Sequence, residues 1–218
     1  MHVAEGVLSG SASGIAVLGA SALLAAAGTA IGLRRMDYER VPRVAMLSAA
    51  FFVASLVQVP LPPTSEHLML NGLVGLVLGW AAFPAILIAL ILQSVFLPMS
   101  GGITTLGLNT ITMAQPAVVA HYLFRRAARS NRAPVAFAAG MGAGVVATVL
   151  GAMLLWAAFF AAGREFARVS QVVLALLVSL SPVEGLVTAS AVVFLRKVRP
   201  ELLEAPVWRP ARLEVSDG

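Results

Sequence analysis

Residues 68–124 contain no aspartate, glutamate, lysine or arginine, and a run of this kind excludes an ordinary soluble fold. Uncharged apolar runs of about 18 residues or more are typical of transmembrane helices. This run is too long for one crossing, which takes about 20 residues. Proline and glycine predict breaks at residues 80–84 and 98–102. We therefore expect three membrane segments here, near residues 66–80, 83–97 and 105–124.

Four further apolar runs lie near residues 7–33, 44–59, 133–163 and 169–195. With 59% hydrophobic and 11% charged residues, the chain is predicted to be an all-α polytopic membrane protein with seven transmembrane helices. We expect a single membrane domain over residues 1–200 and a polar cytoplasmic tail over residues 201–218. Segment 66–80 is short for a full crossing. If it is re-entrant, or if there are only six helices, one terminus changes sides.

The distribution of basic residues predicts the orientation. With the N-terminus outside, only Arg164 and Arg168 face outward, and the other 13 of the 15 lysines and arginines face the cytoplasm. An excess of basic residues in cytoplasmic loops is typical of membrane proteins. We therefore expect the N-terminus outside and the C-terminus in the cytoplasm. The net charge of +5 is explained by these loops, so no nucleic-acid partner is expected.

The chain begins Met1-His2, and a histidine at position two is a ready chelator. The amine of Met1, the backbone nitrogen of His2 and its imidazole can close two fused chelate rings on one metal. A fourth nitrogen from another histidine would complete a plane, a geometry that suits nickel, copper or cobalt and not magnesium or calcium. Glu5 sits where a signal peptide would carry positive charge, so we expect Met1 to be the mature terminus.

His67 follows the second predicted helix and falls on the same outer side as His2. Taken alone, His67 is better explained as a histidine at a helix start, with Thr64 or Ser65 as the N-cap. Taken together, Met1, His2 and His67 are candidate ligands of one external metal ion. Asn71 follows His67 by four residues, hence on the same face of a helix.

Three side chains are candidates for orienting these ligands through hydrogen bonds, as outer-shell residues do in metal sites. They are Glu5, Ser65 and Asn71. The third histidine, His121, lies near the cytoplasmic end of its helix, and we interpret it as structural.

Glu184 is the carboxylate deepest within an apolar run. It precedes Arg196 by roughly 18 Å along a helix, which places it near the bilayer midplane. A buried carboxylate at this depth is a functional candidate. A protonated glutamate bonded to a neighbouring helix explains it as well, and we do not assign it as a metal ligand.

Several chemistries lack their sequence motifs. Lys197 is the only lysine and no phosphate-binding GxxxxGK[ST] surrounds it, so ATP hydrolysis by that route is excluded. The sequence has no HExxH and no serine-nucleophile motif, and its lack of cysteine excludes thiolate metal sites. We expect a protein that is not an enzyme.

The motifs as a set resemble the CbiM/NikM family, the cobalt/nickel substrate-binding (S) components of energy-coupling factor transporters. The resemblance covers nearly the full length, with the motifs in order: MHVAEG at 1–6, PTSEHLMLNG at 63–72, LGWAAFP at 78–84, GGITTLG at 101–107 with Asn109 and Thr110, VEGLVT at 183–188 and RPELL at 199–203.

The resemblance implies an S-component helical bundle with one extra N-terminal helix. It implies four metal-binding nitrogens in a plane: the Met1 amine, the His2 amide nitrogen and the imidazoles of His2 and His67. It also implies a transmembrane coupling subunit, ATPase subunits, in many systems a small additional membrane subunit, and a location in the cytoplasmic membrane of a bacterium or archaeon. No cofactor is expected beyond the transported ion.

We therefore expect an importer of cobalt or nickel, with a slight lean to cobalt, feeding cobalamin biosynthesis. Two alternatives stay open: a membrane metal sensor or scaffold without transport, and a proton-coupled metal carrier that uses Glu184.

Overall fold

The computed structural model describes residues 2–37, 39, 41–56, 59–61, 64–66, 68–97 and 101–204; at residues 2, 59–61, 64–66 and 204 only the backbone is described. The helices are α1 (Ala12–Arg34), α2 (Val41–Ala54), α3 (Asn71–Leu78), α4 (Ala82–Phe96), α5 (Leu106–Ala128), α6 (Ala133–Ala162), α7 (Ala167–Val198) and α8 (Glu201–Glu204). Two 3-10 turns, η2 (Gly79–Ala81) and η3 (Arg164–Phe166), precede α4 and α7. The strands are β1 (His2–Val3), β2 (Val59–Leu61) and β3 (Thr64–Glu66).

Each of the seven predicted membrane segments overlaps one of the helices α1 to α7. Among the described residues, four stretches are long and apolar enough to cross a bilayer: residues 12–34, 71–96, 133–162 and 164–198. The predicted helix over residues 66–80 is wrong in its first part, because α3 begins at Asn71 and spans 8 residues. At 1.5 Å per residue α3 is about 12 Å long, well short of the hydrocarbon core.

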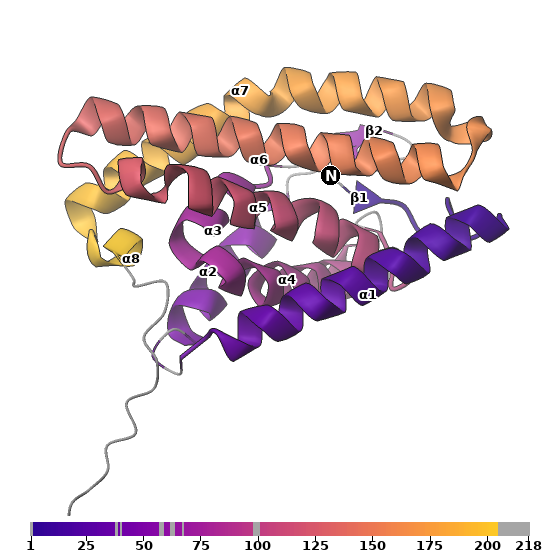
Figure 1. The fold of residues 1–218 in the computed structure, drawn as a ribbon, viewed down its shortest axis with the longest axis horizontal. Coiled ribbons are helices and arrows are strands. Elements are labelled where there is room, and N and C mark those ends of the chain that lie inside the picture. The colour runs from indigo at the N-terminus through magenta and orange to yellow at the C-terminus, as the bar shows by residue number, and fades with distance from the viewer. Residues whose placement is uncertain are drawn as a thin grey trace, which may run out of the picture.

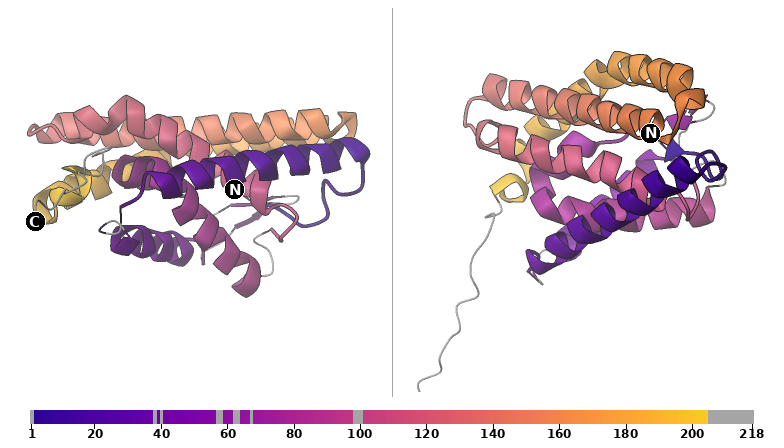
Figure 2. Two further views of the ribbon diagram at one scale, coloured as in Figure 1. Left: turned by 60° about the horizontal axis from the view of Figure 1, so that its bottom comes forward. Right: turned by 45° about the vertical axis from the view of Figure 1, so that its right-hand side comes forward.

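The longest helices, α6 and α7, run side by side along one face of the molecule (Figures 1 and 2). Small residues bring their backbones together, as in many membrane helix pairs. A methyl group on Gly140 would lie 2.6 Å from Cα of Ala189. One on Gly144 would lie 2.7 Å from both the carbonyl oxygen of Glu184 and Cα of Gly185. These glycines are required for the close contact.

Helix α3 lies in the core of the bundle, with all its residues buried. It contacts α5 and α6 backbone to backbone. A methyl group on Gly72 would lie 2.6 Å from the backbone nitrogen of Gly144, and one on Gly75 would lie 2.1 Å from the carbonyl oxygen of Ala117. The chain turns sharply after α3 at Gly79, whose φ of +58° favours glycine.

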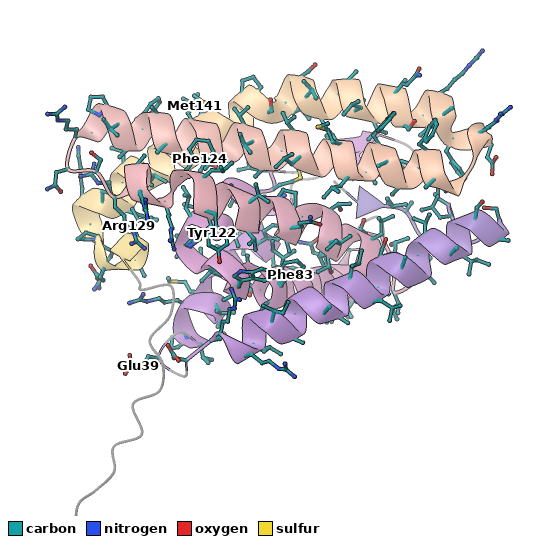
Figure 3. The ribbon with its side chains drawn as sticks, viewed as in Figure 1. Glu39, Phe83, Tyr122, Phe124, Arg129 and Met141 are labelled. Carbon is teal, nitrogen blue, oxygen red and sulfur yellow. The ribbon has the colours of Figure 1, made fainter. Side chains whose placement is uncertain are left out.

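Basic and aromatic side chains meet near the end of α1. The Arg35 guanidinium lies 5.1 Å from the centre of the Trp80 ring, and Trp80 Nε1 donates a 3.0 Å hydrogen bond to the Tyr122 hydroxyl. Figure 3 shows Tyr122 and Phe83 in this region, and the Phe83 ring stacks on Trp80. His121 is buried, with Nδ1 2.9 Å from the Gly75 carbonyl oxygen, which agrees with a structural role.

The start of the predicted polar tail is folded. Residues 201–204 form α8, and Arg129 at the end of α5 donates from Nε to the Leu203 carbonyl at 2.6 Å (Figure 3). The end of α1, the α5–α6 connection and α8 lie at one end of the molecule, and the α6–α7 connection lies at the other (Figure 1). Arg164 and Arg168 thus lie at one end of the molecule, and the other described basic residues lie at the opposite end.

A small antiparallel sheet was not expected from the sequence. Its strand order is β1-β3-β2, so β3 lies between the N-terminal strand and the strand that follows α2. Val59 pairs with Glu66, and Leu61 pairs with Thr64. The sheet joins the N-terminus to the segment that the sequence analysis identified as the second part of the metal site.

Candidate metal centre

The pairing of β1 with β3 brings the two halves of the predicted site together. His2 pairs with Ser65, and Val3 pairs with Thr64. His67 is the next residue in the sequence after Glu66, where β3 ends. Of the three predicted ligands, Met1 and His67 lie outside the described residues, and His2 is described by its backbone alone.

Asn109 of α5 fastens the N-terminal strand to the bundle. Its Oδ1 accepts a 3.0 Å hydrogen bond from the backbone N–H of Val3, and both residues are buried. Its Nδ2 lies 3.4 Å from Thr105 Oγ1, a contact that fixes which way the amide faces. Asn109 lies two residues after the GGITTLG motif in the sequence, but only the fold identifies its hydrogen-bond partner.

The turn before α5 packs over the same strand. Gly101 has φ +75°, and a methyl group there would lie 2.8 Å from the carbonyl oxygen of Val3. Any side chain at this position would push β1 away. The predicted orienting residue Glu5 is exposed, and its carboxylate lies against Gly102 of this turn. Glu5 therefore contacts the turn that covers β1.

Glu184 of α7 binds the backbone of the segment that follows His67. Its carboxylate accepts hydrogen bonds from the N–H of Met69 at 2.5 Å and of Leu70 at 3.1 Å. The side chain is 4% exposed, so these bonds form out of contact with bulk solvent. The prediction that Glu184 is buried is confirmed. These two bonds use the acceptor oxygens of the carboxyl group, and their donors lie in the chain before α3.

Leu70 explains why this segment needs support. Its φ of 52° lies in the left-handed region, where a side chain with a Cβ costs about 1–2 kcal/mol. Leu70 is the N-cap of α3 and provides no side-chain cap of its own. Strained backbone of this kind persists where surrounding contacts hold it. The Glu184 carboxylate supplies such contacts to Leu70 and to the residue before it.

Two expectations about His67 and its neighbours are wrong. Thr64 and Ser65 lie in β3, and the N-cap of α3 is Leu70. Residues 68–70 are not helical, so Asn71 is not one helical turn after His67. The extended strand and the left-handed Leu70 explain this: both interrupt helical geometry before α3 starts.

Asn71 nevertheless remains of interest. It is 1% exposed, and its Nδ2 lies 3.8 Å from Met69 Sδ. Its Oδ1 is buried and has no hydrogen-bond partner among the residues that the structure describes. A buried acceptor without a partner is uncommon and costly. None of the described contacts satisfies this oxygen. The side chain of Ser65, the third predicted orienting residue, lies outside the described residues.

Within the described ranges, no three histidine, aspartate or glutamate side chains lie close enough together to hold a metal ion. The described part of the centre is therefore its framework: β1, β3, the Gly101–Gly102 turn, Asn109 and Glu184. Sequence reasoning missed the role of this framework, because strands of two or three residues show no alternating pattern.

Comparison with known proteins identifies the same class of protein. The model of the CbiM family, described as the cobalt uptake substrate-specific transmembrane region, matches residues 2–202. A Haemophilus influenzae protein provisionally assigned to metal transport is 42% identical, covering 93% of this chain and 97% of that protein. The cobalt transport protein CbiM of Sorangium cellulosum is 32% identical, covering 94% of this chain and 95% of that protein.

Nickel transporters and a solved structure also match. The fused nickel transport protein NikMN of Rhodobacter capsulatus is 32% identical, and the match covers 84% of this chain and 59% of that longer protein. The crystal structure of a transition metal transporter aligns with a TM-score of 0.64 at 25% identity, covering 91% of this chain and 93% of that one.

Proposed function

This chain belongs to the CbiM family of cobalt/nickel transport membrane proteins, and from that premise we propose that it is the substrate-binding component of an ATP-driven importer of cobalt or nickel. The chain itself binds the ion, and separate subunits hydrolyse ATP. The sequence supports this division, because its only lysine lies outside any phosphate-binding motif.

We propose that the ion is held by the Met1 amine, the His2 amide nitrogen and the imidazoles of His2 and His67. The observation that carries this proposal is the pairing of β1 with β3. Because the strands are antiparallel, stepping from Val3 to His2 in β1 corresponds to stepping toward His67 in β3. The two sequence segments that supply the nitrogens are thus neighbours in one sheet.

The Oδ1 of Asn71, which has no hydrogen-bond partner among the described residues, supports a role beside the ligands. We propose that it accepts the second ring N–H of a metal-bound histidine, a partner that ligating imidazoles almost always have. His67 precedes it by four residues and is the nearest histidine in the sequence. Such a bond would fix the tautomer and orientation of the imidazole.

The proposed membrane orientation has the sheet outside. Arg164, between α6 and α7, and Arg168, at the start of α7, are then the only outward-facing basic residues, against 13 on the cytoplasmic side. This agrees with the positive-inside rule. The seven helices α1 to α7 then cross or enter the membrane, and the site opens to the side from which metal arrives.

The proposed transport cycle needs partners. A transmembrane coupling subunit and ATPase subunits, in some systems with a small membrane subunit, would turn ATP hydrolysis into a movement that exposes the site inward. Binding needs a deprotonated amine and amide and neutral imidazoles, so metal affinity falls as the pH is lowered. The four-nitrogen set serves both metals, and we retain a slight lean to cobalt.

The test is to lengthen the N-terminus by one residue. An added residue moves the free amine and converts the Met1 nitrogen into an amide, so we expect tight binding of nickel and cobalt to be lost in calorimetric titrations of purified protein. The control carries the same residue after Gly218. Equal affinity in the two proteins would overturn the amine–amide chelate.

His2→Ala and His67→Ala separate the two halves of the site. One metal equivalent in the original protein and none held tightly in either variant is the expected result. The metal that binds more tightly identifies the substrate. Undiminished binding in the His67→Ala protein would remove that imidazole from the site.

A further inference from the structure

Glu184 is not one of the proposed metal ligands, yet it contacts the segment that follows one of them. It lies on α7, far from the N-terminus in sequence, yet its carboxylate reaches the backbone of Met69 and Leu70. These residues follow His67 by two and three positions. The carboxylate therefore holds the chain immediately after a proposed metal ligand.

Close packing fixes the position of this carboxylate relative to α3. A methyl group on Gly144 would lie only 2.7 Å from the carbonyl oxygen of Glu184. The backbones of α6 and α7 are therefore in contact at Glu184. On its other side Gly144 meets Gly72, one residue after α3 begins. The start of α3 and Glu184 thus share a contact through Gly144, with no room to shift against each other.

We propose that Glu184 is a positioning residue that fixes the segment carrying His67, so that the His67 imidazole is held ready for the metal. This inference rests on the proposed function and adds a named determinant of metal affinity. In this role Glu184 neither touches the metal nor takes part in proton transfer. It acts through the backbone of Met69 and Leu70, and its two oxygens each receive one N–H.

The chemistry explains why a carboxylate stands here. Two backbone N–H groups converge on one side chain, and an ionised carboxylate offers an acceptor to each. Glutamine offers one acceptor oxygen, and its NH2 group faces the second donor. Leucine offers none. We therefore expect Glu184→Gln to weaken nickel binding moderately and Glu184→Leu to weaken it about 10–100-fold, the range typical of residues that support metal ligands.

The first experiment is a double-mutant cycle on nickel affinity and on the visible absorption of the nickel-bound protein. If Glu184 acts through His67, Glu184→Leu lowers affinity in the original protein and costs nothing further in the His67→Ala background. The nickel spectrum of Glu184→Leu then shifts toward that of His67→Ala, because the same nitrogen is misplaced. Equal losses in both backgrounds, or an unshifted spectrum, would overturn the proposal.

The second experiment needs no metal. Amide hydrogen exchange at Met69 and Leu70 in the metal-free protein should accelerate strongly in Glu184→Leu and less in Glu184→Gln. Ser181→Ala is the matched control, since Ser181 is also 4% exposed on α7 and its hydroxyl bonds to the Val178 carbonyl of the same helix. Unchanged exchange at Met69 and Leu70 in both Glu184 variants would overturn the contact itself.

The two experiments distinguish failure of this inference from failure of the proposed function. If the original protein binds neither nickel nor cobalt, the proposed function is wrong and the metal role of Glu184 falls with it, while exchange still reports whether Glu184 holds the segment. If metal binds and depends on His2 and His67, but Glu184→Leu and Glu184→Gln leave affinity unchanged, only the positioning role is wrong.

Discussion

The α6–α7 pair and the β3–α3 segment (residues 64–78) differ in how regular their backbone is and in which contacts hold them in place. The pair consists of long regular helices, 30 and 32 residues, held together by glycine and alanine contacts. The segment combines a three-residue strand, a left-handed Leu70 and an eight-residue helix. It is held by polar contacts from other elements. The regular pair thus serves as a scaffold, and the irregular segment carries the candidate site.

The comparison matters because backbone in the membrane must have its hydrogen bonds satisfied. Long helices satisfy nearly all of theirs internally. Residues 68–70 are not helical, so their N–H groups need partners from elsewhere in the bundle, and Glu184 provides them for two residues. Irregular backbone in membrane proteins is tolerated where protein surrounds it, and residues 68–70 are half-buried or buried at the start of the fully buried α3.

The largest expected effect comes from breaking the scaffold at Gly144. Gly144→Ala places a methyl group 2.7 Å from the Glu184 carbonyl oxygen and from Cα of Gly185, so α6 and α7 must separate. We expect a loss of about 1–3 kcal/mol, typical of overpacking, measured by thermal unfolding in detergent. Metal affinity should fall as well, because Glu184 moves with α7.

Gly19→Ala is the control for that change. Nothing lies within 4 Å of a methyl group at Gly19, so the same substitution on α1 should leave stability unchanged or raise it by up to about 1 kcal/mol through helix propensity. Equal stability of the two variants would contradict the close-packing argument.

An effect on stability confined to the N-terminal strand, with a clear effect on metal binding, is expected from Asn109→Ala. The variant leaves the buried Val3 N–H without its acceptor, which costs about 1–3 kcal/mol locally, and it frees β1. We expect nickel affinity to drop about tenfold or more, in the range of supporting residues. Calorimetry and thermal unfolding of the same preparations check this.

Thr112→Val is the matched control for Asn109→Ala. Thr112 is buried on the same helix, and its hydroxyl bonds only to carbonyls of α5, at Leu108 and Asn109. Metal affinity should not change in this variant. A comparable affinity loss in both variants would mean that α5 acts through general packing and not through the bond to Val3.

The smallest effect is expected far from the site, at Arg129. Arg129→Gln removes the 2.6 Å bond to the Leu203 carbonyl, a loss of about 1 kcal/mol for an ordinary hydrogen bond. We expect faster hydrogen exchange in residues 201–204 and unchanged metal affinity. Arg126→Gln, at an exposed neighbour on α5, removes the same charge and should change neither quantity.

Much of the architecture could be predicted from the sequence. Hydropathy places α1 and α4 to α7 within a few residues of their observed bounds, because uncharged apolar runs have few alternatives to a helix. Gly140 and Gly144 are one helical turn apart, a spacing of small residues that is typical of closely packed membrane helices, and the structure shows close contacts at both. The burial of Glu184 was also predicted, since charged side chains in apolar runs face the protein interior.

The site could be predicted only in part. The residue types at positions 1, 2 and 67 indicated a nitrogen chelator, but the helix expected at residues 66–80 was misplaced, because a short strand and a left-handed leucine leave no periodic signal. The partners of Asn109 and Glu184 were not predicted either. Each contact joins residues over 100 positions apart, and no local pattern encodes such pairs.

The sequence by itself determined that this chain is a helical membrane protein of the cobalt/nickel transport family, because hydrophobicity and motif order are local properties. Only the tertiary structure decided that β1 pairs beside β3, that Asn109 holds the N-terminal strand, and that Glu184 holds the segment before α3. The reason is physical: a buried N–H must find an acceptor wherever the folded chain brings one within reach.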